Sequence, residues 1–288
     1  MAFLPDEKSQ PVTYQLIHPR EYEHQATYRG YLFGPFRFFR EEQSVGELMQ
    51  RRNKARLILK WFLLNPGKLG SADEFIDLFW PEIAPRQALG NFHVTMHYLR
   101  RILEPELSAR VESSFIHRKP NNFYWFQLDE RWWMDTSDVT MLLERAHASD
   151  HHGDYTRATY YYRKIAGYCS QGFLPEDESE EWLLPYRRHY KHIYYHALKR
   201  LIQIYMQRNE LEEVLEYAYQ TLLIDPLNEI ATRAIVDTYL QQENIPGAQR
   251  RLDFFLSSLQ QGLGLRPGKD LSILRERIRA ASNSTKEN

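Results

Sequence analysis

Hydrogen-bonding side chains share one face of a predicted helix in the stretch QALGNFHVTMHYLRRILEP, residues 87–105. At 100° per residue, the apolar residues fall on one side at spacings of three and four: Leu89, Phe92, Met96, Leu99 and Leu103. Polar groups surround one β-branched residue on the opposite side, with two further residues at its margin: Gln87, Gly90, Asn91, Val94, Tyr98 and Arg101, then Arg86 and His97. Amides, guanidinium groups and a methyl-bearing side chain are the groups that recognise base edges in the major groove of DNA. The pattern alone also fits a solvated helix face on which one Val is exposed.

Histidine spacing offers a second kind of chemistry, metal binding. His93 and His97 lie four residues apart, and a later predicted helix carries His189, His192 and His196 on one face. No cysteine or carboxylate set accompanies either group at a spacing typical of zinc sites, so solvated helix faces explain these histidines better. No phosphate-binding loop, GxSxG motif or HExxH motif occurs in the chain. We therefore expect no catalytic residue, no metal, no cofactor and no enzymatic activity.

Composition places the chain among soluble globular proteins. Its 288 residues suffice for two domains at roughly 100 to 200 residues each, and 14% aromatic content is too high for a disordered chain. Lys60 interrupts the longest apolar run, which falls short of the ~18 residues that a membrane span needs. The amino terminus MAFLPDEK lacks the segments of a signal peptide, and the single cysteine, Cys169, fits a reducing compartment. We expect a cytoplasmic protein that does not cross a membrane.

The net charge of −1 conceals an uneven distribution. Residues 28–119 contain 15 Lys and Arg against 10 Asp and Glu, whereas residues 120–288 contain 20 against 24. The first half is thus the better partner for a polyanion, although a surplus of this size is also typical of an ordinary solvated surface.

Short strands and a basic helix are predicted before the polar face. Aromatic runs with Gly30, Gly34 and Pro35 as turn signals predict two or three strands over residues 28–48. Apolar residues at i, i+3, i+4, i+7 and i+8 then predict a core-facing helix over residues 51–64. The first turn of this helix carries three basic residues: Arg51, Arg52 and Lys54.

A short helix and a hairpin complete the surroundings of the polar face. Ser71 and Glu74 form a capping box, which predicts a short helix that ends at Trp80. After residue 105, two aromatic and β-branched runs flank Pro120-Asn121-Asn122, where asparagine tolerates the positive φ of a tight turn. The chain therefore predicts a β-hairpin with two basic residues at its tip: Arg118 and Lys119. Three helices followed by such a hairpin are the layout of a winged helix-turn-helix.

The second half of the chain predicts a helical repeat. GDYTRA at residue 153, NELEEV at 209 and ENIPGA at 243 each open a helix, and the last two motifs lie 34 residues apart. This is the tetratricopeptide period, in which stacked helix pairs present a surface to a protein partner. The 56-residue gap between the first two motifs leaves room for an insertion containing GFLPEDESEEWLLPYRRHY.

Four motifs in order resemble one known family. They are RRNKARLILKWFLLNPGKLGSADEFIDLFWPE, PRQALGNFHVTMHYLRRILEP, GFLPEDESEEWLLPYRRHYKHIYYHALKRL and LIDPLNEIATRAIVDTYL. With them, the chain from Tyr31 to about Arg279 resembles the bacterial transcriptional activator domain (BTAD) regulators, which include the Streptomyces antibiotic regulatory proteins (SARP). These proteins join an OmpR/PhoB-type winged helix to a tetratricopeptide-like (TPR) activator domain.

The resemblance implies a set of DNA contacts. The third helix is then the recognition helix, with these residues toward the major groove: Arg86, Gln87, Asn91, Val94, His97, Tyr98 and Arg101. Arg118 and Lys119 of the wing, with the basic turn Arg51, Arg52 and Lys54, are then contacts to the phosphate backbone or the neighbouring minor groove. The implied partners are double-stranded DNA, RNA polymerase and a second copy of the chain on direct repeats.

We predict a mainly α protein with a small β part. A poorly structured leader (1–27) precedes a winged-helix domain (28–131), an all-α repeat domain (132–281) and a polar tail (282–288). The expected function is sequence-specific regulation of transcription, with activation by recruiting RNA polymerase through the repeat domain. The alternative is an interaction scaffold whose winged helix no longer binds DNA, which the modest charge surplus also fits.

Overall fold

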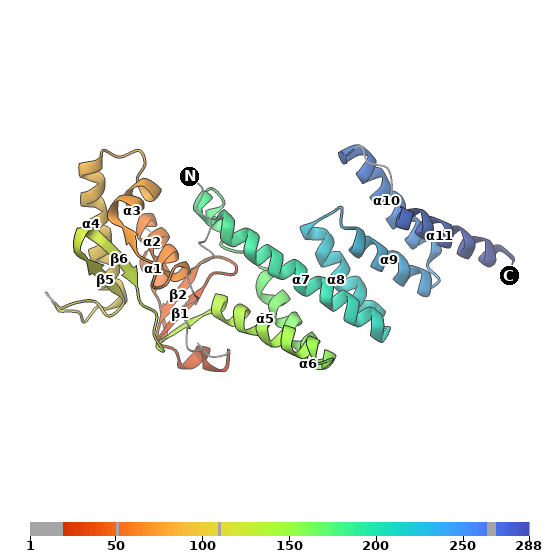
Figure 1. Ribbon diagram of the computed structural model, residues 1–288, viewed down its shortest axis with the longest axis horizontal. Coiled ribbons are helices and arrows are strands. Elements are labelled where there is room, and N and C mark those ends of the chain that lie inside the picture. The colour runs from red at the N-terminus through yellow and green to blue at the C-terminus, as the bar shows by residue number, and fades with distance from the viewer. Residues whose placement is uncertain (1–19, 50–51, 109–110, 264–268, 288) are drawn as a thin grey trace. The chain divides into compact units, whose positions relative to one another are not determined.

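A computed structural model describes residues 20–49, 52–108, 111–263 and 269–287 of the chain. The chain forms two compact units (Figure 1). The first comprises Met1–Met141 and Gly172–Leu184, and the second comprises Leu142–Gln171 and Pro185–Asn288. The predicted fold class is confirmed, since a small β part and a winged helix precede a series of helices.

A four-stranded sheet opens the first unit. Its order is β3 (Gln43–Ser44), β2 (Arg37–Arg40), β1 (Tyr28–Tyr31) and β7 (Trp132–Met134), with β7 parallel to β1. The three buried residues of β7, which the sequence assigned to the all-α domain, thus complete this sheet, and the helical part of the chain begins at Asp135. Gly30 is a strand residue rather than a turn. A Cβ there would lie 2.6 Å from the sulfur of Met134, so any larger residue would require the Met134 side chain to move.

The three predicted helices and the hairpin follow in the predicted order: α2 (Asn53–Leu64), α3 (Ala72–Phe79), α4 (Pro85–Leu103), then the strands β5 (Ile116–Lys119) and β6 (Phe123–Phe126). A short helix, α1 (Val45–Leu48), lies at the end of the region that was predicted to form strands. Strand β4 (Gly70–Ser71) pairs with β6, which gives a second sheet of order β4-β6-β5.

Local chemistry explains where these elements begin and turn. The Ser71 hydroxyl accepts from the Glu74 amide at 3.1 Å, and the Glu74 carboxylate accepts from the Ser71 amide at 2.6 Å. This reciprocal capping box satisfies two amides at the start of α3, as predicted. Asn121 and Asn122 turn the hairpin with φ of 62° and 58°, the left-handed conformation that asparagine tolerates.

The segment Gly172–Leu184, called the return segment here, joins the first unit although it lies between α6 (Tyr155–Cys169) and α7 (Leu184–Arg208). The Leu174 amide donates to the Leu32 carbonyl at 3.0 Å, and the Gly34 amide donates to the Gly172 carbonyl at 2.7 Å. The compact units therefore do not divide at 131/132, where the sequence placed the domain boundary.

A fully buried lysine holds the return segment. Lys60 of α2 has no exposed side-chain surface, and its ammonium donates to Glu176 at 2.9 Å and also to Asp177. Phe36 donates its amide to the same Glu176 oxygen at 2.8 Å. Burial opposes ionisation of Glu176, but the ammonium and the amide outweigh it and hold the pKa of Glu176 below its usual value.

The second unit is a succession of helices. After α6 and α7 come α8 (Leu211–Ile224), α9 (Glu229–Gln241), α10 (Ile245–Leu263) and α11 (Lys269–Glu287), while α5 (Asp135–His151) begins in the first unit and continues into the second. The third residue of each repeat motif begins a helix, as predicted: Tyr155, Leu211 and Ile245. Helix α9 packs against α8 and α10.

The two ends of the chain differ from the prediction in part. Within the predicted leader, Arg20–Gln25 forms a 3-10 helix, and residues 1–19 lie outside the described part. Helix α11 continues through most of the predicted polar tail. Among the described residues, no helix combines the length and the apolar character needed to cross a membrane.

Asp135, the first residue of α5, is a buried carboxylate. One of its oxygens accepts from the amides of Leu32 and Phe33 at 2.7 and 2.9 Å, and the other has no hydrogen-bond partner. Burial raises the pKa of Asp135, and this effect outweighs the opposite effect of the amides, so the pKa is about 7.

We therefore expect Asp135 to make the first unit less stable as pH rises. The folded chain keeps the Asp135 proton up to about pH 7, whereas the unfolded chain loses it near its ordinary pKa of ~3.9, so stability falls between these values and levels off above. Asp135→Asn should remove this part of the pH dependence, measured by urea unfolding from pH 5 to pH 8. Asp77→Asn, at an exposed carboxylate of α3, is the control. A slope unchanged in Asp135→Asn would refute the assignment.

Candidate nucleic-acid interface

Helix α4 buries one side and exposes the other. Pro85 occupies its first position, where a missing amide hydrogen is harmless. The buried residues are Ala88, Phe92, Met96, Leu99, Ile102 and Leu103, and Leu89 is half-buried. The predicted apolar stripe is therefore confirmed, with Leu89 at its edge.

The predicted polar face of α4 lies on the surface. Its exposed residues are Arg86, Gln87, Asn91, Val94, His97 and Arg101, while Tyr98 is half-buried. Val94 is 60% exposed, so this apolar side chain does not belong to the core. Gly90 lies on the same side, and a Cβ atom added to it would have no neighbour within 4 Å. This part of the helix backbone is therefore accessible to another molecule.

Two residues that were predicted to contact DNA lie close together. The guanidinium of Arg52, which immediately precedes α2, sits 4.3 Å from the ring centre of Tyr98 on α4. Stacking on the ring keeps the charge of Arg52 beside the polar face while part of its surface stays hydrated. Lys54 is half-buried in the first turn of α2, and Arg51 lies outside the described residues.

Arg101 already has an acceptor within the unit. Its guanidinium donates to the Leu107 carbonyl at 2.7 Å, in the loop that follows α4, although the side chain is exposed. A guanidinium has five N–H donors, so this bond leaves other N–H groups of Arg101 available for an external acceptor.

The hairpin tip places two cations on aromatic rings. The Arg118 guanidinium lies 5.8 Å from the ring centre of Tyr124 and also donates to Asn122. The Lys119 ammonium lies 5.2 Å from the ring centre of Trp125. Both side chains are exposed, so the tip presents two charges at positions set by the turn.

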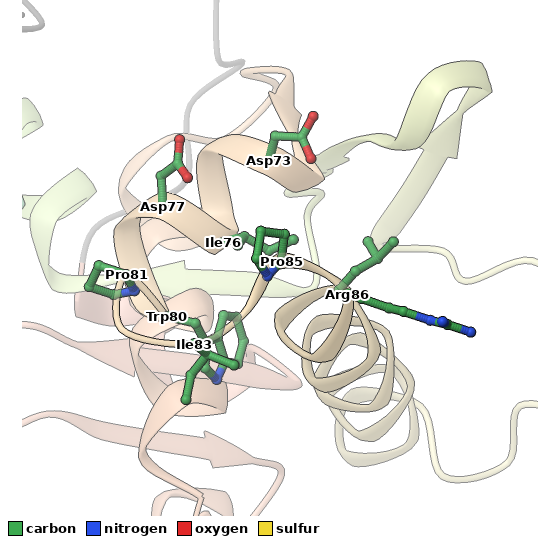
Figure 2. A pocket seen from close by; sticks show the side chains of 9 residues that line it. Asp73, Ile76, Asp77, Trp80, Pro81, Ile83, Pro85 and Arg86 are labelled. Atoms are coloured by element: carbon green, nitrogen blue, oxygen red, sulfur yellow. The ribbon is translucent and has the colours of Figure 1, made fainter.

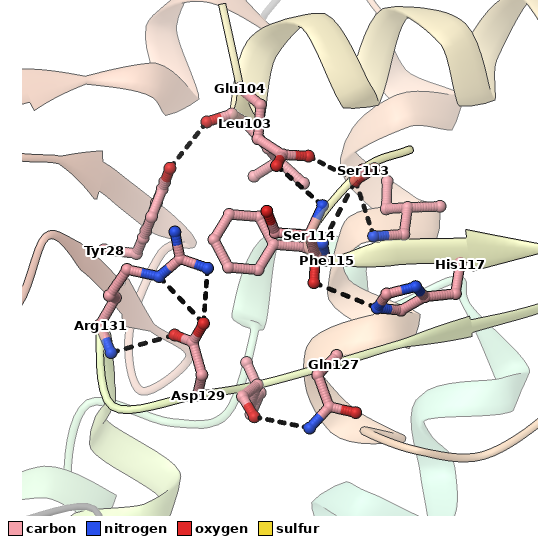
Figure 3. Close-up of polar contacts among 12 residues, drawn as sticks. Tyr28, Leu103, Glu104, Ser113, Ser114, Phe115, His117, Gln127, Asp129 and Arg131 are labelled. Atoms are coloured by element: carbon pink, nitrogen blue, oxygen red, sulfur yellow. Dashed lines mark hydrogen bonds and ion pairs between the residues drawn. The ribbon is translucent and has the colours of Figure 1, made fainter. Parts of the chain in front are cut away.

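Polar contacts anchor the carboxyl end of α4 to the rest of the first unit (Figure 3). Tyr28 of β1 donates its hydroxyl to the Leu103 carbonyl at 2.9 Å. Glu104, which ends the helix, accepts from the hydroxyl of Ser113 and from the amide of Ser114 at 2.8 Å. The bond from Tyr28 uses a carbonyl that a helix end otherwise leaves unpaired. Together the three bonds tie α4 to the sheet and to the segment that leads into the hairpin.

A groove of about 560 Å³ lies at the other end of α4. Asp73 and Asp77 lie one turn apart on α3 at its edge, and Arg86 extends away from them (Figure 2). The apolar part of its lining includes Ile76, Trp80 and Leu89. Arg86, a residue of the predicted polar face, lines this groove together with the two carboxylates, so the groove borders that face. The two carboxylates repel phosphate, which makes the α3 side of the groove unfavourable for the DNA backbone.

Sequence reasoning missed His93 as a member of this surface. His93 is exposed and lies seven residues, about two turns, after Arg86, so the two share a side of the helix. Its position on the helix could have identified it, but the residue was considered only for metal binding.

One histidine of the later group meets a partner that spacing did not indicate. His196 of α7 lies with its Nε2 3.1 Å from Nε2 of His147 on α5, and burial with this neighbour lowers the pKa of His196. Within the described part of the chain, no group of three or more His, Cys, Asp or Glu side chains is arranged so that it could hold a metal ion.

Comparison with known proteins decides the family. The model for the bacterial transcriptional activator domain matches residues 134–279 of the chain. The chain belongs to this family. It is therefore a member of a family of transcriptional regulators rather than of enzymes, and the resemblance to SARP-like regulators is confirmed. The activator domain by sequence includes the return segment, which packs with the winged helix.

A solved structure supports the fold. It is "Mycobacterium tuberculosis EmbR in complex with low affinity phosphopeptide", with 17% identity and a TM-score of 0.71, over 91% of this chain and 68% of that chain. The same fold is thus reached with few residues in common. No curated protein matches the sequence.

Replacing Glu104 should loosen the end of α4. Glu104→Ala removes two charge-assisted hydrogen bonds, and we expect a loss of about 1.5–3 kcal/mol in the unfolding free energy of the first unit. The matched control is Glu106→Ala, since Glu106 is an exposed carboxylate two residues later. Urea unfolding of both variants measures the difference. Equal stability of the two variants would show that Glu104 does not anchor the helix.

Proposed function

We propose that the chain is a sequence-specific DNA-binding regulator of transcription that uses the polar face of α4 in the major groove. The observation that carries the proposal is the exposed side of α4, where Asn91 and Gln87 flank Val94. Amide side chains pair with adenine, and an apolar group contacts the thymine methyl, so this face supports base recognition.

The surrounding charges support the same orientation. Arg52 lies beside Tyr98 of the polar face, and the hairpin tip carries the exposed Arg118 and Lys119. These cations are available for the phosphate contacts that position a protein on DNA.

The activating role is assigned to the second unit. Stacked helices offer a broad surface for a protein partner, and the family to which the chain belongs activates transcription. We propose that this unit recruits RNA polymerase in the cytoplasm and that two copies bind direct repeats.

A scaffold function is the second candidate. Three of the predicted basic contacts have partners within the unit: Arg52 on Tyr98, Arg101 on Leu107 and Arg118 on Asn122. Together with the small charge surplus of the first half, these contacts favour a winged helix that does not bind DNA. In that case, the second unit alone would carry the function by binding a protein.

In vitro selection from a random duplex pool separates the two candidates. A regulator enriches one sequence, and a second copy of it at fixed spacing supports binding on direct repeats. Failure to enrich any sequence at moderate salt would reject the regulator and leave the scaffold. Capture of purified RNA polymerase by the full chain tests activation separately, and absence of capture would reject that role.

Asn91→Ala should reduce specific affinity by about 1–3 kcal/mol, the cost of losing a base contact. Affinity for an unrelated duplex should stay unchanged, because the amide carries no charge. The control is Arg250→Ala, at an exposed residue of α10, which should change neither affinity. Fluorescence anisotropy on both duplexes measures the effect. An equal loss on both duplexes would contradict a role for Asn91 in base recognition.

Removing the hairpin charges should change the salt dependence of binding instead. For Arg118→Ala combined with Lys119→Ala, we expect the slope of log affinity against log salt to fall by about one per lost phosphate contact. The slope for Arg250→Ala should equal that of the native chain, since this arginine lies in the second unit. A slope unaffected by the double substitution would show that the hairpin tip does not reach the backbone.

A further inference from the structure

The return segment is fixed to the first unit at three places. Its start pairs with the backbone of the strand region at Leu32 and Gly34. Its middle holds Lys60 of α2 through two carboxylates. Its end places the ring of Trp182 on Phe79, the last residue of α3, with 5.9 Å between ring centres and an angle of 88°.

Lys60 makes the return segment necessary to the unit. A buried ammonium is costly unless it is paired and hydrogen-bonded, and Lys60 is fully buried. Its paired carboxylates, Glu176 and Asp177, lie more than 110 residues along the chain. A winged helix that ended at residue 131 would lack both counter-ions, so the return segment is part of its structure.

Aromatic rings connect the return segment to the recognition helix. Trp182 contacts Phe79, which stacks on Phe75 with centres 6.3 Å apart, and Phe75 stacks on Phe92 of α4 at 5.6 Å. Trp80, the residue after α3, also contacts Phe92, at 6.4 Å. The rings that pack against α4 are thus continuous with Trp182. Phe92 directly follows Asn91, a residue of the polar face.

We infer that the return segment is a positioning element for the DNA-binding face, through which the second unit controls α4. The segment continues directly into α7 at Leu184. A change in the second unit that moves Leu184 therefore also moves the ring of Trp182, which contacts Phe79 of α3. Trp182 is a positioning residue and does not touch DNA. The control of DNA affinity rests on the proposed function, whereas the positioning of α4 does not.

Hydrogen exchange in the full chain without DNA tests the positioning. In Trp182→Ala, amides of α3 and of the Phe92 region of α4 should exchange several-fold faster, whereas Trp182→Phe, which keeps a ring against Phe79, should behave as the native chain. The amides of α8 and α9, which belong to the second unit, are the internal reference. Unchanged exchange of α3 and α4 in Trp182→Ala would overturn the inference. If this variant fails to fold, Trp182→Leu, which keeps an apolar side chain, provides the same comparison.

DNA binding tests the second part of the inference. Trp182→Ala should bind the selected duplex roughly tenfold more weakly, within the range for substitutions along a coupling path, and an unrelated duplex as before. Native affinity despite faster exchange in α4 would overturn the control of DNA binding. If the native chain prefers no sequence, the proposed function fails, and hydrogen exchange still decides whether Trp182 positions α4.

Discussion

The face of α4 that is proposed to contact DNA is fixed by the face that it buries. Phe92 stacks on Phe75 of α3 and meets Tyr124 of the hairpin edge-on, with centres 5.2 Å apart. Packed aromatic rings tolerate little rotation, because each ring occupies a space shaped by its neighbours. A rotation of α4 by one residue, 100°, would turn Phe92 out of its place and bring the exposed Asn91 or His93 toward the core. The rings packed against Phe92 therefore determine which polar groups of α4 point outward.

Patterns that act over a few residues predicted the winged helix well. Ser71 and Glu74 form the expected capping box, and Asn121 adopts the expected positive φ. The apolar stripe of α4 was predicted because a helix repeats its faces every three or four residues. Each of these features depends on neighbours in the sequence, so the sequence alone contains the information that they need.

Features that depend on distant residues were missed. Strand β7 pairs with β1 about 100 residues earlier, and no local pattern distinguishes WWM from the start of a helix. Lys60 was recognised only as a break in an apolar run, although its burial depends on Glu176. The sequence predicted which residues face DNA but not their contacts within the unit, such as that of Arg52 with Tyr98 and that of Arg101 with the Leu107 carbonyl. Such pairings arise only when the chain folds.

The family domain and the compact units divide the chain differently. By sequence, the activator domain covers residues 134–279, whereas Gly172–Leu184 packs as part of the winged-helix unit. In a regulator built in this way, the winged helix is incomplete without the activator domain, because that domain supplies the counter-ions of Lys60. This dependence gives a physical reason for the two parts to act together.

Dimethyl sulfate footprinting on a selected duplex tests the central claim most directly, because the reagent modifies guanine N7 in the major groove and adenine N3 in the minor groove. If α4 enters the major groove, guanine N7 atoms within the selected site are protected when the chain binds, since N7 is an acceptor on the edge that the helix contacts. Guanine N7 atoms that stay fully reactive across the whole site would contradict the account.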